Sequence, residues 1–273
     1  MSTNLVAANA TYHSAERVLA LLASFEDGRP ELSVTEIAEA LGVHKSTASR
    51  LAATLERTGF LARSGRRYRL GVEIIRLGSL ALRGDDIVVR LQPAMDQLSG
   101  LTGETINLAV PAGPDILNVA EVPSSYFLNS SGGWIGRRTK PHAVANGKVL
   151  LAFGVIPMPA TLERYTEHTI CSVPDLQAEL AEIRRDGYAT AVAELEDGLV
   201  AVAAPVFGPD GNCVAALSIS GPAYRMPPDK LDELGRLCAA AAPKGRGADW
   251  TERRGKEVPQ KRPRRRKEME RYG

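Results

Sequence analysis

Residues 43–53 gather short hydroxyl and basic side chains, with no acid among them. We predict a helix over about His44–Thr58. Its outward face would carry Ser46, Ser49, Arg50 and Ala53, with Lys45 at the N-terminal edge. Phosphate repels acids, and small residues let a helix lie deep in a groove of DNA. The pattern therefore indicates a helix that faces nucleic acid, with Arg50 as its one long donor.

A basic hairpin is predicted directly after this helix. The segment "FLARSGRRYRLG" (residues 60–71) has the pattern of two short strands around a Ser64-Gly65 turn. Its cations, with no acid among them, are Arg63, Arg66, Arg67 and Arg69. Such a hairpin can lay arginines along a phosphate backbone or in a minor groove.

The sequence also predicts the helices that position these side chains. Ser33 and Glu36 have the spacing of a capping box, so a helix begins after Ser33 and ends near Gly42. The apolar faces of the two helices would be Val34, Ile37, Ala38 and Leu41, then Ala48, Leu51, Ala52 and Leu55. An ordinary amphipathic helix pair would share this pattern, but the basic hairpin favours a winged helix-turn-helix.

We assign this DNA-binding domain to residues 13–71, after a disordered N-terminus at 1–12. The predicted DNA contacts are Thr35, His44, Lys45, Ser46, Thr47, Ser49, Arg50, Arg63, Arg66 and Arg67. Residues 72–83 form a linker helix that is apolar on more than one face and needs cover on two sides. Pairing with the same helix of a second subunit would supply that cover, and packing on the chain's own second domain is the alternative.

The composition and the charge distribution limit the kinds of protein that this sequence can be. Of 273 residues, 44% are hydrophobic and 5% aromatic, and no signal or membrane-spanning pattern occurs, so we expect a cytoplasmic protein. The net charge of +2 hides an asymmetry: +3 over residues 1–83, −8 over 84–243 and +7 over 244–273. Only the basic ends are suited to a polyanion. The three cysteines form no CxxC pair and indicate buried thiols.

Residues 84–243 predict an α+β domain of antiparallel strands with separate helices. Pro93 should kink or restart the helical pattern that begins near Ile87. Two apolar runs around Pro209-Asp210-Gly211 form the clearest hairpin. The other expected strands cover "TINLAVPAG", "DILNVAEVP" and "SSYFLNS". The expected helices lie near 143–153, 160–167, 176–186 and 228–242.

Several ordered motifs now resemble one family, the IclR-type bacterial transcriptional regulators. They are "PHAVANGKVLLAF", "AEIRRDGYATAVAELEDGLVAVAAPVFGPDG" and "VAALSISGP", within a resemblance that covers about residues 15–242. The resemblance implies a winged helix-turn-helix joined by a helix to a GAF-like effector-binding domain. It also implies a dimer or dimer of dimers on operator DNA, modulated by a small organic metabolite, and most often repression.

Carried over by motif, the effector-binding residues are Ala145, Asn146, Ala191 to Glu194, Pro205, Ser218 and Ser220. Two departures concern ligand polarity. Asn146 stands where the family usually has a small apolar residue, and Ala189–Ala193 replace acids that many members carry. Spacing alone leaves open whether Ser218 and Ser220 face a pocket, neighbouring backbone or solvent.

Signatures of other chemistry are missing from the sequence. His168 and Cys171 form one H-x-x-C, short of a zinc site, and G-x-S-x-G, G-x-G-x-x-G and P-loop motifs are lacking. We therefore expect no metal, no cofactor and no enzyme. The basic tail at 244–273 has too few aliphatics for a core and is predicted to be disordered, either inert or a DNA-holding arm. The alternative function is a ligand-independent architectural DNA-binding protein.

Overall fold

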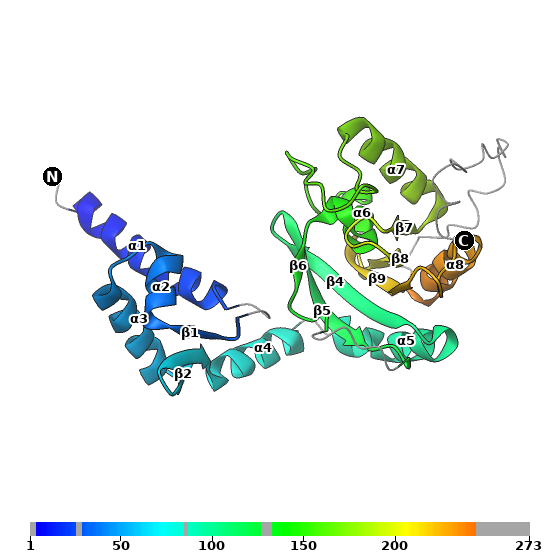
Figure 1. Ribbon diagram of the computed structural model, residues 1–273. Coiled ribbons are helices and arrows are strands. Elements are labelled where there is room, and N and C mark those ends of the chain that lie inside the picture. The colour runs from blue at the N-terminus through cyan, green and yellow to red at the C-terminus, as the bar shows by residue number, and fades with distance from the viewer. Residues whose placement is uncertain (1–3, 26–28, 85–86, 127–132, 244–273) are drawn as a thin grey trace. The chain divides into compact units, whose positions relative to one another are not determined.

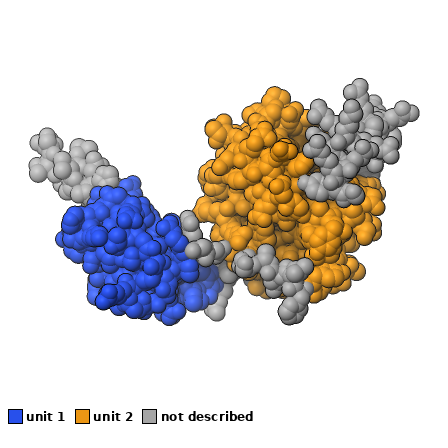
Figure 2. All heavy atoms as spheres, in the orientation of Figure 1, with its two compact units in different colours: residues 1–86 blue, residues 87–273 orange. Residues whose placement is uncertain are grey.

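The computed structural model describes residues 4–25, 29–84, 87–126 and 133–243. The chain divides into two units, residues 1–86 and 87–273, each with its own core (Figures 1 and 2). The linker helix expected at 72–83 belongs by its contacts to the first unit. The basic tail at 244–273 lies outside the described residues.

The first unit packs helices against a small antiparallel sheet of strand order β1-β3-β2. Its elements are α1 (Asn4–Ala23), β1 (Glu31–Ser33), α2 (Val34–Leu41), α3 (Lys45–Arg57), β2 (Leu61–Ser64), β3 (Arg67–Leu70) and α4 (Val72–Gly84). The capping box is present, because the Ser33 hydroxyl accepts from the Glu36 backbone N–H while the Glu36 carboxylate accepts from Ser33. Gly42 ends α2 with φ 61°, a conformation that glycine adopts without steric cost.

The predicted winged helix-turn-helix is therefore present, with local differences. The wing turn lies at Gly65-Arg66, one residue later than expected, because Ser64 pairs with Arg67 in the ladder. Strand β1 was not predicted. Residues 4–12, expected to be disordered, belong to α1, consistent with a segment that lacks glycine and proline and is rich in alanine.

The second unit is built on a six-stranded antiparallel sheet of order β6-β5-β4-β9-β8-β7 (Figure 1). Its strands are β4 (Thr105–Ala112), β5 (Asp115–Val122), β6 (Arg138–Thr139), β7 (Ala189–Val192), β8 (Leu199–Phe207) and β9 (Cys213–Pro222). Its helices are α5 (Ile87–Thr102), α6 (Ala145–Ala152), α7 (Val173–Asp186) and α8 (Leu231–Ala241), with short 3-10 turns at Pro141–Ala143 and Pro228–Lys230. The predicted α+β class is confirmed.

Helices cover both faces of this sheet. Alternate residues of β8 and β9, such as Val202 and Leu217, form a core with α5 and α8. The intervening residues, such as Ala203 and Ala216, pack with α6 and α7 on the other face. Helix α5 continues through Pro93. No helix in the described ranges is both long and apolar enough to cross a membrane.

Two expected elements of the second unit are wrong or untested. No helix forms over residues 160–167. Side chains hold the backbone there instead: the Thr169 hydroxyl accepts from the Tyr165 and Thr166 N–H groups, and the Thr166 hydroxyl donates to the Ala193 carbonyl. In the expected strand "SSYFLNS", residues 124–126 are not a strand, and the rest lies outside the described residues.

Candidate functional site

The outward face of α3 is exposed as predicted. Ala48, Ala52 and Leu55 are buried, whereas Lys45, Ser46, Ser49 and Arg50 are exposed on the other side of the helix. Among the described residues, Arg50 has no ion-pair partner. This face therefore offers hydroxyl groups and free cations to an approaching polyanion.

The remaining predicted contacts from the helices have local roles as well. His44 is the N-cap of α3, and its Nδ1 accepts from the Ser46 backbone N–H at 3.3 Å. Thr47 is half-buried in the first turn of α3, and Thr35 is half-buried in the first turn of α2. The capping role of His44 was not anticipated, because histidine is not among the preferred N-cap residues.

Two of the wing arginines are held by acids of the same unit. Arg63 makes paired hydrogen bonds to Glu56, each 3.1 Å long, and donates to the Tyr68 hydroxyl. These bonds hold the pKa of Glu56 below its usual value.

Arg67 ties the wing to α2. Its guanidinium lies 2.8 Å from a Glu36 carboxylate oxygen and also donates to the Glu31 carbonyl. Hydrogen bonds from Ser33 and then from Arg67 lower the pKa of Glu36 to about 2. Arg66 and Arg69 are exposed and carry no ion pair within the described part of the chain. Of the predicted wing contacts, Arg66 is therefore the one whose charge is uncompensated.

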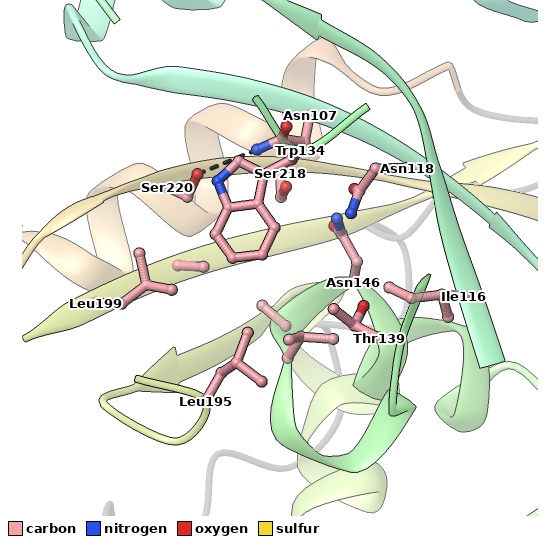
Figure 3. A pocket seen from close by; sticks show the side chains of 13 residues that line it. Asn107, Ile116, Asn118, Trp134, Thr139, Asn146, Leu195, Leu199, Ser218 and Ser220 are labelled. Carbon is pink, nitrogen blue, oxygen red and sulfur yellow. Dashed lines mark hydrogen bonds between the residues drawn. The ribbon is translucent and has the colours of Figure 1, made fainter. Parts of the chain in front are cut away.

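The second unit contains a small cavity of about 50 Å³ on the α6 side of the sheet (Figure 3). Its walls come from β4, β5, β6, β8, β9, the start of α6 and the segments before β6, α6 and β8. The lining residues are Asn107, Ile116, Asn118, Trp134, Thr139, Val144, Ala145, Asn146, Leu195, Leu199, Ala201, Ser218 and Ser220.

Four of the predicted effector residues line this cavity: Ala145, Asn146, Ser218 and Ser220. The two serines are 3% and 8% exposed, so they face the cavity and not solvent. Ala191, Glu194 and Pro205 do not line it. Ala191 packs in the core against α6 and α7, Pro205 pairs with Ala216 inside the sheet, and Glu194 is engaged in an ion pair.

Sequence reasoning missed half of the six amide and hydroxyl residues of the lining, namely Asn107, Asn118 and Thr139. Asn107 and Asn118 lie on neighbouring strands, and Trp134 and Thr139 lie between β5 and α6. In Figure 3 the Asn118 and Asn146 amides point toward one another, and the Trp134 ring lies between them and Ser220. A buried asparagine in the middle of an apolar strand was the available signal, because such a group needs a hydrogen-bond partner.

Polar atoms around the cavity are left without partners. The side-chain oxygens of Asn107, Asn118, Thr139 and Asn146 are buried and accept or donate no hydrogen bond within the described structure. Asn107 donates through its nitrogen to the Ser220 hydroxyl at 3.1 Å. Each unpaired buried group costs about 1–3 kcal/mol, so such a cluster is characteristic of a binding site.

A buried ion cluster supports the wall formed by α6 and the loop before β8. The Lys148 ammonium, fully buried, lies 2.8 Å from Glu194 and 3.3 Å from Glu179. Burial lowers the pKa of Lys148, but the two carboxylates raise it further, so that the pKa lies above its usual value. The pair connects α6, which supplies Asn146, to the loop that supplies Leu195.

The close approach behind this wall requires a glycine. A Cβ at Gly147 would lie 2.3 Å from the Pro141 backbone.

In the described ranges, no group of three His, Cys, Asp or Glu side chains gathers in a way that could hold a metal ion.

Comparisons with known proteins agree with this arrangement. Residues 14–65 match the IclR helix-turn-helix domain, and residues 79–244 match the bacterial transcriptional regulator IclR C-terminal domain. The HTH-type transcriptional regulator KdgR of Escherichia coli is 33% identical over 236 residues, which are 84% of this chain and 89% of that protein. The HTH-type transcriptional repressor AllR of Klebsiella pneumoniae is 31% identical over 239 residues, or 83% and 86%.

A solved structure shares both units. An IclR homologue from Microbacterium hydrocarbonoxydans, complexed with 4-hydroxybenzoate, is 26% identical with a TM-score of 0.69, over 82% of this chain and 95% of that one. The family matches extend over the helix-turn-helix and the domain that contains the cavity, and the chain therefore belongs to the IclR family of bacterial transcriptional regulators.

Proposed function

We propose that this protein is a repressor that binds operator DNA through α3 and the wing, and that a small molecule in the cavity of the second unit changes that binding. Its family is one of ligand-responsive DNA-binding regulators. The observation that carries the proposal for this chain is the cavity lined by buried polar atoms that have no hydrogen-bond partner in the described structure. A purely architectural DNA-binding protein has no need of such a site.

In the DNA complex, Arg50 would reach a base edge, while Lys45, Ser46 and Ser49 would contact the phosphate backbone. Exposure of these side chains supports the assignment. Arg66 at the wing tip would add a phosphate or minor-groove contact. Arg63 and Arg67 would position the wing, since acids of the same unit already hold them.

Self-association would use α4. Val72 and Ile75 are 72% and 71% exposed, and Leu77 and Leu80 are also exposed. An apolar surface of this kind favours pairing with a second copy, which would place two recognition helices on two half-sites. We further propose that the protein acts in the cytoplasm and has no enzymatic activity.

The test uses the full chain and a binding site selected from random or genomic DNA. The selected operator complex is then titrated with metabolites, for the wild type, Asn146→Ala and Gln177→Ala. Gln177 is an exposed amide on α7 and serves as the matched control. We expect Asn146→Ala to retain operator affinity without ligand and to require more metabolite for release. The proposal fails if no sequence is selected, or if no metabolite alters the complex in any of the three proteins.

A further inference from the structure

Among the residues that the structure describes, the polar lining of the cavity is uncharged. It comprises three amides and three hydroxyls, from Asn107, Asn118, Asn146, Thr139, Ser218 and Ser220, and the other lining residues are apolar or, at Trp134, aromatic. The four most buried of these polar residues on the strands and α6 are 3–7% exposed: Ser218, Asn107, Asn118 and Asn146. A ligand that enters this cavity therefore replaces its hydrogen bonds to water with hydrogen bonds to the amide and hydroxyl side chains.

The amides set the hydrogen-bonding requirement. Whichever way each amide is turned, it presents one donor end and one acceptor end. Four side-chain oxygens around the cavity have no partner in the described part of the chain, and three of them are amide oxygens that can only accept. A carboxylate supplies acceptors alone, so it would leave the three amide oxygens unsatisfied. A hydroxyl both donates and accepts, and a chain of hydroxyls satisfies both ends.

Three cations of the described chain that neighbour lining residues are already engaged. Lys148 is held by Glu194 and Glu179, and Arg138 donates to the Ala112 carbonyl. Arg137 lies over the Trp134 ring, 5.0 Å from its centroid. None of these cations is among the lining residues. A buried carboxylate without a paired cation is costly, and the positive end of α6 alone compensates only a small part of that cost.

The loop beside the cavity is acidic. Glu196 and Asp197 are exposed and lie in sequence between the lining residues Leu195 and Leu199. Their negative field disfavours the approach of an anion and is indifferent to a neutral molecule.

The volume of the cavity and the position of the Trp134 ring restrict the class of ligand further. About 50 Å³ holds roughly four water-sized groups, since one water needs about 10–15 Å³ on the same measure. The Trp134 ring offers an apolar surface at the cavity, next to Ser220 and Asn146 (Figure 3). A short carbon chain with a hydroxyl on each carbon presents C–H groups to the indole and O–H groups to the amides.

We propose that the effector is a small uncharged polyol, about the size of a triol or tetrol, and not a carboxylate. This inference rests on the proposed function, because it specifies the ligand of the same cavity.

Calorimetric titration of the full chain with matched alcohol and acid pairs tests it. The probes are glycerol against glycerate and erythritol against erythronate. We expect at least one alcohol to bind ten times or more tightly than its acid, and to release the selected operator. Tighter binding of the acids would overturn the inference, as would a lack of binding in both series.

A variant separates ligand contact from structural support. Thr139→Val keeps the shape of the side chain and removes an unpartnered hydroxyl. We expect the polyol to bind about fivefold more weakly, the effect of one lost hydrogen bond, while the thermal midpoint without ligand stays equal or rises. Thr190→Val, a buried threonine on β7 that does not line the cavity, is the control and should leave polyol affinity unchanged. Unchanged affinity in Thr139→Val would contradict the inference.

The outcomes also distinguish this inference from the proposed function. If an acid or another charged metabolite binds and releases the operator, the polyol class is wrong and the regulator remains. If a polyol binds but operator affinity does not respond, the cavity is a polyol site and the regulatory proposal fails.

Discussion

The two units place their polar groups in opposite settings. In the first, Arg50 and Arg66 are exposed on one α-helix and one hairpin, and their partner must come from outside. In the second, Asn118 on β5 and both Asn146 and Lys148 on α6 are buried. The exposed set costs little to maintain, since water solvates it in the free protein. The buried set is costly unless each group has a partner, so its arrangement depends on the fold around it.

The largest effect should come from the buried ion cluster. Lys148→Met leaves the Glu194 carboxylate buried without its cation, and we expect the free energy of unfolding to fall by about 3–5 kcal/mol. Lys140→Met is the matched control, because Lys140 is 48% exposed in its pair with Asp115 and its loss should change stability by about 0–1 kcal/mol. Urea denaturation of both variants measures the difference. Equal losses of unfolding free energy in the two variants would show that burial does not make the Lys148 pair more important for stability than the Lys140 pair.

The next effect concerns the exposed recognition face. Arg50→Ala should cost about 1–3 kcal/mol of discrimination at one base position in each half-site, because Arg50 is the long donor on the exposed face of α3. Selection of binding sites from random DNA with both proteins measures this. An unchanged motif at unchanged affinity would make Arg50 a bystander.

Wing arginines allow a sharper comparison within the first unit. Arg66→Ala should reduce the slope of log K against log salt by about one, because its exposed charge is free to contact phosphate. Arg63→Ala should leave that slope nearly unchanged, because Glu56 and Tyr68 already hold its guanidinium. Operator binding at several salt concentrations tests the pair. Equal slope changes would mean that DNA displaces Glu56.

The same contrast explains what the sequence could predict. The capping box at Ser33, the glycine at Gly42 and the face of α3 depend on neighbours within one or two helical turns, so spacing alone placed them. Charge in the wing was visible as well, but the pairing of Arg67 with Glu36 spans 31 positions and was not.

The cavity was only partly predictable for the same physical reason. Asn107 meets Ser220 across 113 positions, through the pairing of β4 with β9. Asn118 joins them through β5, which pairs with the other edge of β4. Motif resemblance located Asn146 and the two serines, but it also included Glu194, whose carboxylate is used by Lys148. Local spacing carries no information on which strands become neighbours.

The smallest expected effect is the acid sensitivity of the hydrogen bonds that Glu36 makes with Ser33 and with Arg67 of the wing. The pKa of Glu36 is lowered to about 2 from an ordinary value of 4.5, so its ionised form stabilises the fold above about pH 4.5, and this contribution is lost as the pH falls toward 2. Glu36→Gln should therefore lose less thermal stability than the wild type between pH 5 and pH 3. Glu39→Gln, at an exposed position of α2, should behave like the wild type. Circular dichroism melts across that window provide the measurement. A wild type and Glu36→Gln with parallel pH dependence would show that the bonds of Glu36 to Ser33 and Arg67 add nothing to stability, and Arg67 would then be available to DNA.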